Sequence, residues 1–204
     1  MKMTRNVRLF VVAIALAALA VAPLSGQTVV IDKIDRNHST IGFSVPILGG
    51  LSEVEGKFTD FSLTIKYDTA DVTRSTVTAT IATKSINTGI PERDEDLRSK
   101  NFFGVEQFPE IRFTSTKIKH RDKQLVVQGD LSMHGVKRPV SLPMTFHIEH
   151  VNDSTIQFAA ASNIDLDRDD YGISWRHPKN TFVSDKVQVR IRVISRLIPL
   201  SKPE

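Results

Sequence analysis

Cysteine is absent from this chain of 204 residues. Its absence excludes disulfide bonds, catalysis by a thiolate and a lipid-modified N-terminal cysteine, so packing must supply the stability of the fold. Aromatic residues with a polar group are also scarce, since there are one tryptophan and two tyrosines against 11 phenylalanines. The aromatic content therefore consists mostly of apolar surface that needs no hydrogen-bond partner.

Motifs of common catalytic and metal sites are missing too. No serine lies in a G-x-S-x-G turn, and no glycine-rich nucleotide or phosphate loop is present. The acidic run at residues 165–170 fails as a calcium loop because Asp170 and Arg176 replace its glycine and glutamate. The six histidines lack zinc-site spacing. We expect no metal, no cofactor and no enzymatic activity, although a site assembled from distant residues stays open. Asp94 and Asp96 are expected in an exposed charged cluster.

The predicted mature chain also lacks an excess of positive charge. The formal net charge of +4 includes Lys2, Arg5 and Arg8, which precede an apolar run of 14 residues at 9–22. Because a membrane span needs about 20 residues, residues 1–26 are predicted to be a cleaved secretory signal, with an uncleaved membrane anchor as the alternative. Residues 27–204 then form one periplasmic or secreted domain with 27 − 3 = 24 basic and 23 acidic residues. This balance argues against nucleic-acid binding.

The dominant pattern after residue 27 is alternation of apolar and polar residues. It predicts half-buried antiparallel strands. We expect them at residues 28–34, 39–47, 52–67, 71–83, 110–118, 123–134, 138–150, 154–163 and 185–196. One short helix is expected at 91–102, where Pro91 suits the first turn and acidic residues follow it.

About eight strands in one domain predict a closed antiparallel barrel, because closure removes exposed edges. A barrel of this size can hold one small ligand. The many phenylalanines fit either a filled core or a long apolar cavity, and alternation alone does not distinguish the two.

Four sequence blocks, in the same order, resemble the YceI-like family. They are HSTIGFSV at 38–45, DLRSKNFFGVEQFPEIRFTST at 96–116, GDLSMHGVKRPV at 129–140 and IDLDRDDYGISW at 164–175, and the closing segment VSDKVQVRIRV at 183–193 also fits. The resemblance implies an all-β fold, an extended antiparallel lipocalin-like barrel of about eight strands with one short helix. It further implies a long-chain polyisoprenoid held in the pore.

The resemblance and the strand faces together suggest which residues line the pore. The candidates are Phe43, Val45, Phe58, Phe102, Phe103, Phe113, Leu131, Met133, Leu142 and Met144. Leu97, Phe102 and Phe103 are expected to close or line one end of the barrel, or else to dock a short helix on its outside. By the resemblance, Arg168, Asp170 and Gly172 match a family pattern at a barrel corner, where an arginine–carboxylate pair would hold the turn.

The predicted function is non-catalytic binding, sequestration or transport of a polyisoprenoid or related fatty amphiphile. At about −0.3 kcal/mol per heavy atom, a tail of roughly 40 atoms would bind with nanomolar affinity. Transient membrane contact and a homodimer are compatible with this role. Two alternatives stay open: an enzyme acting on a lipid in the same cavity, and a filled barrel with a surface-mediated stress role. Asp96 and Pro46-Ile47 depart from histidines common in the family, which affects the choice of head group.

Overall fold

The computed structural model describes residues 27–122, 124–152, 155–174 and 183–199. The predicted signal at 1–26 lies outside these residues. Within them, no helix has the length and apolar character needed to cross a membrane.

Alternating side chains form twelve strands in the described chain, more than the eight or nine expected, because the segment 52–67 forms two strands and two additional strands are only two residues long. The strands are β1 (Thr28–Ile31), β2 (Thr40–Ile47), β3 (Ser52–Phe58), β4 (Phe61–Asp68), β5 (Thr76–Ala82), β6 (Ile86–Asn87), β7 (Glu110–Arg121), β8 (Gln124–Met133), β9 (Val136–Asn152), β10 (Thr155–Asp167), β11 (Lys186–Ile194) and β12 (Ile198–Pro199). Four 3-10 turns, η1 (Leu48–Gly50), η2 (Val72–Arg74), η3 (Thr83–Ser85) and η4 (Asp169–Tyr171), accompany a single α-helix, α1 (Pro91–Arg98).

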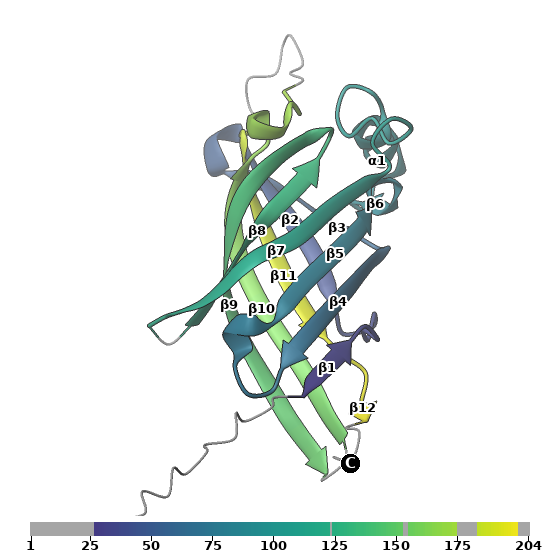
Figure 1. Ribbon diagram of the computed structural model, residues 1–204. Helices are drawn as coiled ribbons and strands as arrows, with labels where there is room; N and C mark the ends of the chain where they lie inside the picture. Colours follow the sequence, from purple (N-terminus) through teal and green to yellow (C-terminus); the bar gives the residue numbers. More distant parts are fainter. Residues whose placement is uncertain (1–26, 123, 153–154, 175–182, 200–204) are drawn as a thin grey trace, which may run out of the picture.

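The strands curl into an extended antiparallel barrel, as expected (Figure 1). Their order is β1-β4-β5-β7-β8-β9-β10-β11-β2-β3-β6, with β12 beside β10. In the described residues, no strand pairing joins the end strands β1 and β6. An isolated bridge between Ile34, which follows β1, and Ser195, which follows β11, connects the two sides of the barrel at one place. Helix α1 lies at the upper end of the barrel in Figure 1, and β12 lies near the lower end.

Strand β9 links the two halves of the barrel. Its first part pairs with β8 from Val136 to Met144, and its later part pairs with β10 from Thr145 onward. The strand expected at 138–150 begins earlier, at Val136, so that Pro139 and Pro143 both lie inside it. Both prolines lie where β9 has a strand partner on one side only, so a missing N–H can face the unpaired side without breaking a ladder bond.

Two expected elements need correction. The strand predicted at 52–67 is two strands, because the chain turns at Thr59 and Asp60 and moves from one side of the barrel to the other. The helix predicted at 91–102 ends at Arg98, and residues 99–103 continue as hydrogen-bonded turns. Asp94 is also not exposed: it is buried and accepts hydrogen bonds from the backbone N–H and the hydroxyl of Thr88, at 2.8 and 2.6 Å.

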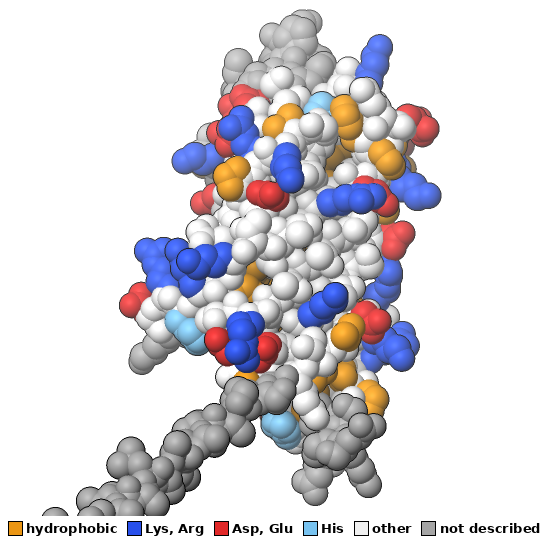
Figure 2. Space-filling model, viewed as in Figure 1, with side chains coloured by type: hydrophobic (Ala, Val, Ile, Leu, Met, Phe, Trp, Pro, Cys, Tyr) orange, Lys and Arg blue, Asp and Glu red, His pale blue; other side chains and the backbone are white. Residues whose placement is uncertain are grey.

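The outer surface is polar and mixed in charge. Figure 2 shows Lys, Arg, Asp and Glu side chains scattered over one face, with few hydrophobic side chains between them. The apolar residues of the alternating strands therefore face inward, which is the arrangement that places the candidate site inside the barrel.

Candidate functional site

The barrel encloses an apolar cavity of about 210 Å³. Of the 27 described residues that line it, Ser75 is the only polar one. The Ser75 hydroxyl is already used, since it accepts a hydrogen bond of 3.0 Å from the backbone N–H of Asp68. The cavity thus offers contact with hydrocarbon and little for a polar group to bind.

Alternation on neighbouring strands builds this lining. Alternate residues of one strand point to the same face, so each strand that crosses the cavity contributes a row of aliphatic or aromatic side chains. The row from β9, for example, is Val140, Leu142, Met144 and Phe146, and facing rows come from β4, β5, β7, β8, β10 and β11.

Two glycines make room for aromatic rings on this inner face. A Cβ atom added to Gly129 would lie 2.5 Å from Cζ of Phe113, and one added to Gly56 would lie 2.3 Å from Cζ of Phe43. Any larger residue would force these rings to move. The two glycines therefore fix where two of the largest inner side chains lie.

The predicted pore residues divide into two groups in the structure. Six of the ten lie on the wall of the cavity: Phe58, Phe113, Leu131, Met133, Leu142 and Met144. Phe43, Val45 and Phe103 belong instead to a packed cluster next to the cavity, and Phe102 is half-buried without lining it. Contact of any of the ten with a ligand stays a prediction.

Aromatic side chains fill the end of the barrel under α1. The ring centroid of Phe58 is 5.9 Å from that of Phe43 and 5.9 Å from that of Phe103, the latter pair meeting edge to face at 89°. Leu97 of α1 packs on the same cluster. Because Phe58 also lines the cavity, this cluster separates the cavity from the α1 end. Leu97 and Phe103 thus lie where a closing function was expected.

A second apolar cluster occupies the opposite end. Its buried members are Ile31, Ile65, Ile156, Phe158, Ala160 and Ile198, contributed by β1, β4, β10 and β12. The cavity lies between these two filled ends.

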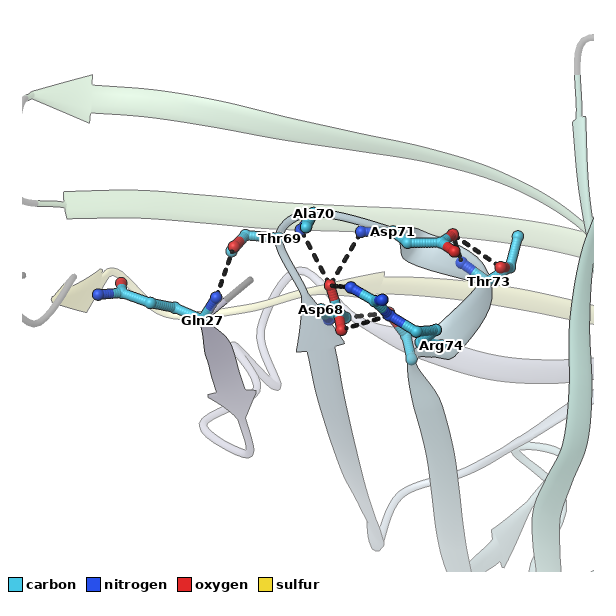
Figure 3. Close-up of polar contacts among 8 residues, drawn as sticks. Gln27, Asp68, Thr69, Ala70, Asp71, Thr73 and Arg74 are labelled. Carbon is cyan, nitrogen blue, oxygen red and sulfur yellow. Dashed lines mark hydrogen bonds and ion pairs between the residues drawn. The ribbon is translucent and has the colours of Figure 1, made fainter. Parts of the chain in front are cut away.

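The connection between β4 and β5 is held by a network of hydrogen bonds (Figure 3). The Asp68 carboxylate accepts from the backbone N–H groups of Ala70 and Asp71, both at 2.9 Å, and from the Arg74 guanidinium at 2.9 and 3.0 Å. The Arg74 hydrogen bonds, followed by those from the backbone, lower the pKa of Asp68 to about 2. This network fixes the loop so that Val72 packs against the buried residues of the cavity wall.

The turn after β10 is held by Arg168, which pairs with a carboxylate as expected and also binds a backbone carbonyl. The buried Arg168 guanidinium lies 2.9 Å from the Asp185 carboxylate and donates to the carbonyl of Ile173 at 2.8 Å. Asp170 is paired with Arg138 at 3.4 Å. Gly172 has a φ of 71°, which glycine adopts at little cost. These residues stabilise a corner outside the cavity.

Sequence patterns did not reveal a second, polar pocket beside the cavity. It has a volume of about 250 Å³ and is lined by His120, Asp122, Gln124, Leu125, Met144, Thr145 and Phe146. Three of these, Leu125, Met144 and Phe146, also line the main cavity, so the two spaces adjoin. Among the described residues, no three His, Asp or Glu side chains gather in a metal-binding group.

Comparison with known proteins agrees with this architecture. The YceI-like domain model matches residues 33–194. A UPF0312 protein of Photorhabdus laumondii is 41% identical over 112 residues, and the YceI protein of Salmonella arizonae is 38% identical over 112 residues. Each of these matches spans 54% of this chain and 58% of the relative's length.

Solved structures share the fold at lower identity. BcnA of Burkholderia cenocepacia superposes with a TM-score of 0.69 at 21% identity, over 80% of this chain and all of that one. A polyisoprenoid-binding domain from Saccharophagus degradans gives a TM-score of 0.60 at 16% identity, over 85% of this chain and 99% of that one. With its family model matched across most of the described barrel, the chain belongs to the YceI-like family.

Proposed function

We propose that this protein binds an isoprenoid or a related amphiphilic lipid inside its barrel and sequesters or transports it. The observation that carries the proposal is the cavity itself, whose lining in the described part of the chain is apolar except for one serine already engaged by the backbone. Transfer of a hydrocarbon tail from water into such a space is favourable in proportion to the apolar area buried. The polyisoprenoid-binding neighbour of the same fold supports the ligand class.

The volume sets the length of tail that fits. Since one water-sized group needs about 10–15 Å³ of open volume, the cavity of about 210 Å³ holds on the order of 15–20 carbon atoms. This is about half the tail assumed from the sequence. At about −0.3 kcal/mol per heavy atom, 20 atoms give about −6 kcal/mol, or a Kd in the tens of micromolar. A longer tail would bind more tightly only if the barrel widens or the tail extends out of it.

Binding rather than catalysis fits the site better. A catalytic role needs polar groups converging on a substrate, and the cavity wall is hydrocarbon. The alternative of a barrel with a filled core is disfavoured by the cavity volume. With residues 1–26 as a secretory signal, we further propose that the protein acts in the periplasm or outside the cell.

A titration with isoprenoid alcohols of 10, 15, 20 and 30 carbons tests the proposal. We expect affinity to rise with length up to about 20 carbons and then to level off, as the volume estimate requires. Ala79→Leu, which fills the cavity, should weaken binding of the 20-carbon alcohol, whereas Thr78→Leu on the exposed face of the same strand should not. Equal binding by both variants, or no binding by the wild type, would contradict a tail inside the barrel.

A further inference from the structure

An amphiphile held in this cavity needs a separate place for its polar head. Among the described residues, Ser75 is the only polar one that lines the cavity, and apolar clusters occupy both ends of the barrel. Leaving a hydroxyl or a charge unpaired against such a wall costs several kcal/mol. The head must therefore lie where the lining changes from apolar to polar.

That change occurs at the tip of the β7–β8 hairpin. Strand pairing places His120 opposite Leu125 and Leu125 opposite Met144, so the three side chains form one row across β7, β8 and β9. Leu125 and Met144 belong to the cavity wall, and His120 belongs to the adjoining polar pocket with Asp122 and Gln124. The shared side chains Leu125, Met144 and Phe146 lie between the cavity and this pocket, so a tail that displaces them can place its head there.

A bulge in β7 is what turns His120 toward this row. Before the bulge, Ile111 and Phe113 face the cavity, and after it Ile118 does. The register shift lies between Ser115 and Lys117 and changes which residues face inward. As a result, His120 shares the face of Ile118, whereas Lys119 and Arg121 fall on the other face. Figure 2 shows Lys and Arg side chains gathered at the side of the molecule near this hairpin.

The chemistry of the pocket is mixed, with one carboxylate. In the described residues, the side chains of His120, Asp122 and Gln124 are exposed and make no hydrogen bond to another part of the protein. The imidazole and the amide each offer a donor, the amide oxygen and the carboxylate offer acceptors, and the carboxylate repels a second anion. A hydroxyl can donate to Asp122 and accept from Gln124 or His120, whereas a phosphate or a carboxylate in the pocket meets the Asp122 charge directly, because Lys119 and Arg121 lie on the other face of the hairpin.

We propose that this pocket holds the head of the bound amphiphile and favours an uncharged hydroxyl over an anionic group. The inference rests on the proposed lipid binding and adds the position and chemistry of the head.

The test compares four 20-carbon isoprenoids that share one tail: the hydrocarbon, the alcohol, the carboxylic acid and the monophosphate. Their affinities are measured by calorimetry on delipidated protein at low salt. We expect the alcohol to bind most tightly. Asp122→Asn should improve binding of the acid and the phosphate about two- to fivefold, the size of one exposed charge interaction. Asparagine tolerates the positive φ of 54° at this position, so the variant should fold.

Two further variants locate the effect. Asp165→Asn removes an exposed carboxylate on the outer face of β10 and should leave all four affinities unchanged. His120→Leu should weaken the alcohol about two- to fivefold, the loss expected for one exposed hydrogen bond, and spare the hydrocarbon. Equal affinity for the three heads, or tightest binding of the phosphate, would overturn the inference while leaving tail binding intact. Failure of all four ligands to bind would instead overturn the proposed function.

Discussion

The ring of Phe113 lies over Gly129 of the neighbouring strand, so closely that a Cβ atom at Gly129 would be 2.5 Å from the ring. Phe113 lines the cavity, which makes Gly129 a determinant of the cavity's shape although it has no side chain.

A methyl group at Gly129 would also lie 2.5 Å from the backbone oxygen of Thr114, so Gly129→Ala should push the Phe113 ring into the cavity and strain the pairing of β7 with β8. We expect lower stability, by about 1–3 kcal/mol as for other overpacked cores, together with weaker binding of a 20-carbon tail. Gly56→Ala is the comparison variant, because the three nearest atoms to a Cβ there belong to the side chains of Phe43 and Thr88, neither of which lines the cavity. It should lower the melting temperature with little effect on binding. Equal losses of affinity in the two variants would contradict this assignment.

The α1 end gives a second expectation. Phe103 packs edge to face on Phe58, which separates the cavity from that end. Phe103→Ala should open this end and speed the release of lipid. Since Phe103 is only half-buried, the substitution should lower the free energy of unfolding by less than the about 3–5 kcal/mol lost when a fully buried phenylalanine is replaced by alanine. Phe102→Ala, also half-buried but not in the cluster, should retain lipid; a stopped-flow measurement of release distinguishes the two.

Inward charges should have different effects in the filled and hollow parts of the barrel. Phe43→Asp places a carboxylate in a packed cluster, where it has neither water nor a partner, and we expect the domain to unfold. Met144→Asp places one beside the polar pocket, where water reaches it in the absence of lipid. That variant should fold, as seen by circular dichroism, and lose affinity for the tail. A folded Phe43→Asp protein would show that this end is not filled.

The β4–β5 loop should respond to acid. The folded-state pKa of Asp68 is about 2, below its ordinary value of 3.8, so ionised Asp68 stabilises the native state above about pH 4. This contribution is lost as the pH falls from about 4 to 2. Asp68→Asn should therefore lower stability at neutral pH, and its difference from the wild type should shrink over that window. Arg74→Leu removes the main cause of the shift and should act in the same direction; urea unfolding at several pH values measures both.

Export can be checked by the intact mass of the mature protein. We expect it to lack about the first 26 residues, because a charged start precedes an apolar run too short to span a membrane. A full-length product held in a membrane fraction would contradict this.

Local alternation was sufficient to predict the long strands and the inner faces of β8 and β9, because a period of two is a local property. It failed where that period changes. Within β3 the inward positions Gly56 and Phe58 are even-numbered, whereas β4 turns the odd-numbered Phe61, Leu63 and Ile65 inward, and this change of parity marks the missed break between β3 and β4. The bulge in β7 changes parity again, and it alone brings His120 to the inner face.

Other features depend on residues far apart in the chain. That Phe43 lies in a filled end rather than on the cavity wall is decided by Leu97 and Phe103, which come from the segment around α1. Likewise, Arg168 pairs with Asp185 across a turn whose geometry no local pattern specifies. Such contacts depend on how the curled sheet brings distant segments together, so they could not be read from any single strand.

Native mass spectrometry of the protein purified without detergent, followed by extraction and identification of the released lipid, tests the central claim most directly. A tail inside the barrel predicts one bound amphiphile per chain, with an isoprenoid or similar hydrocarbon tail, and its loss on denaturation. The mass of the protein alone, in a preparation that also fails to take up added isoprenoid alcohols, would contradict it.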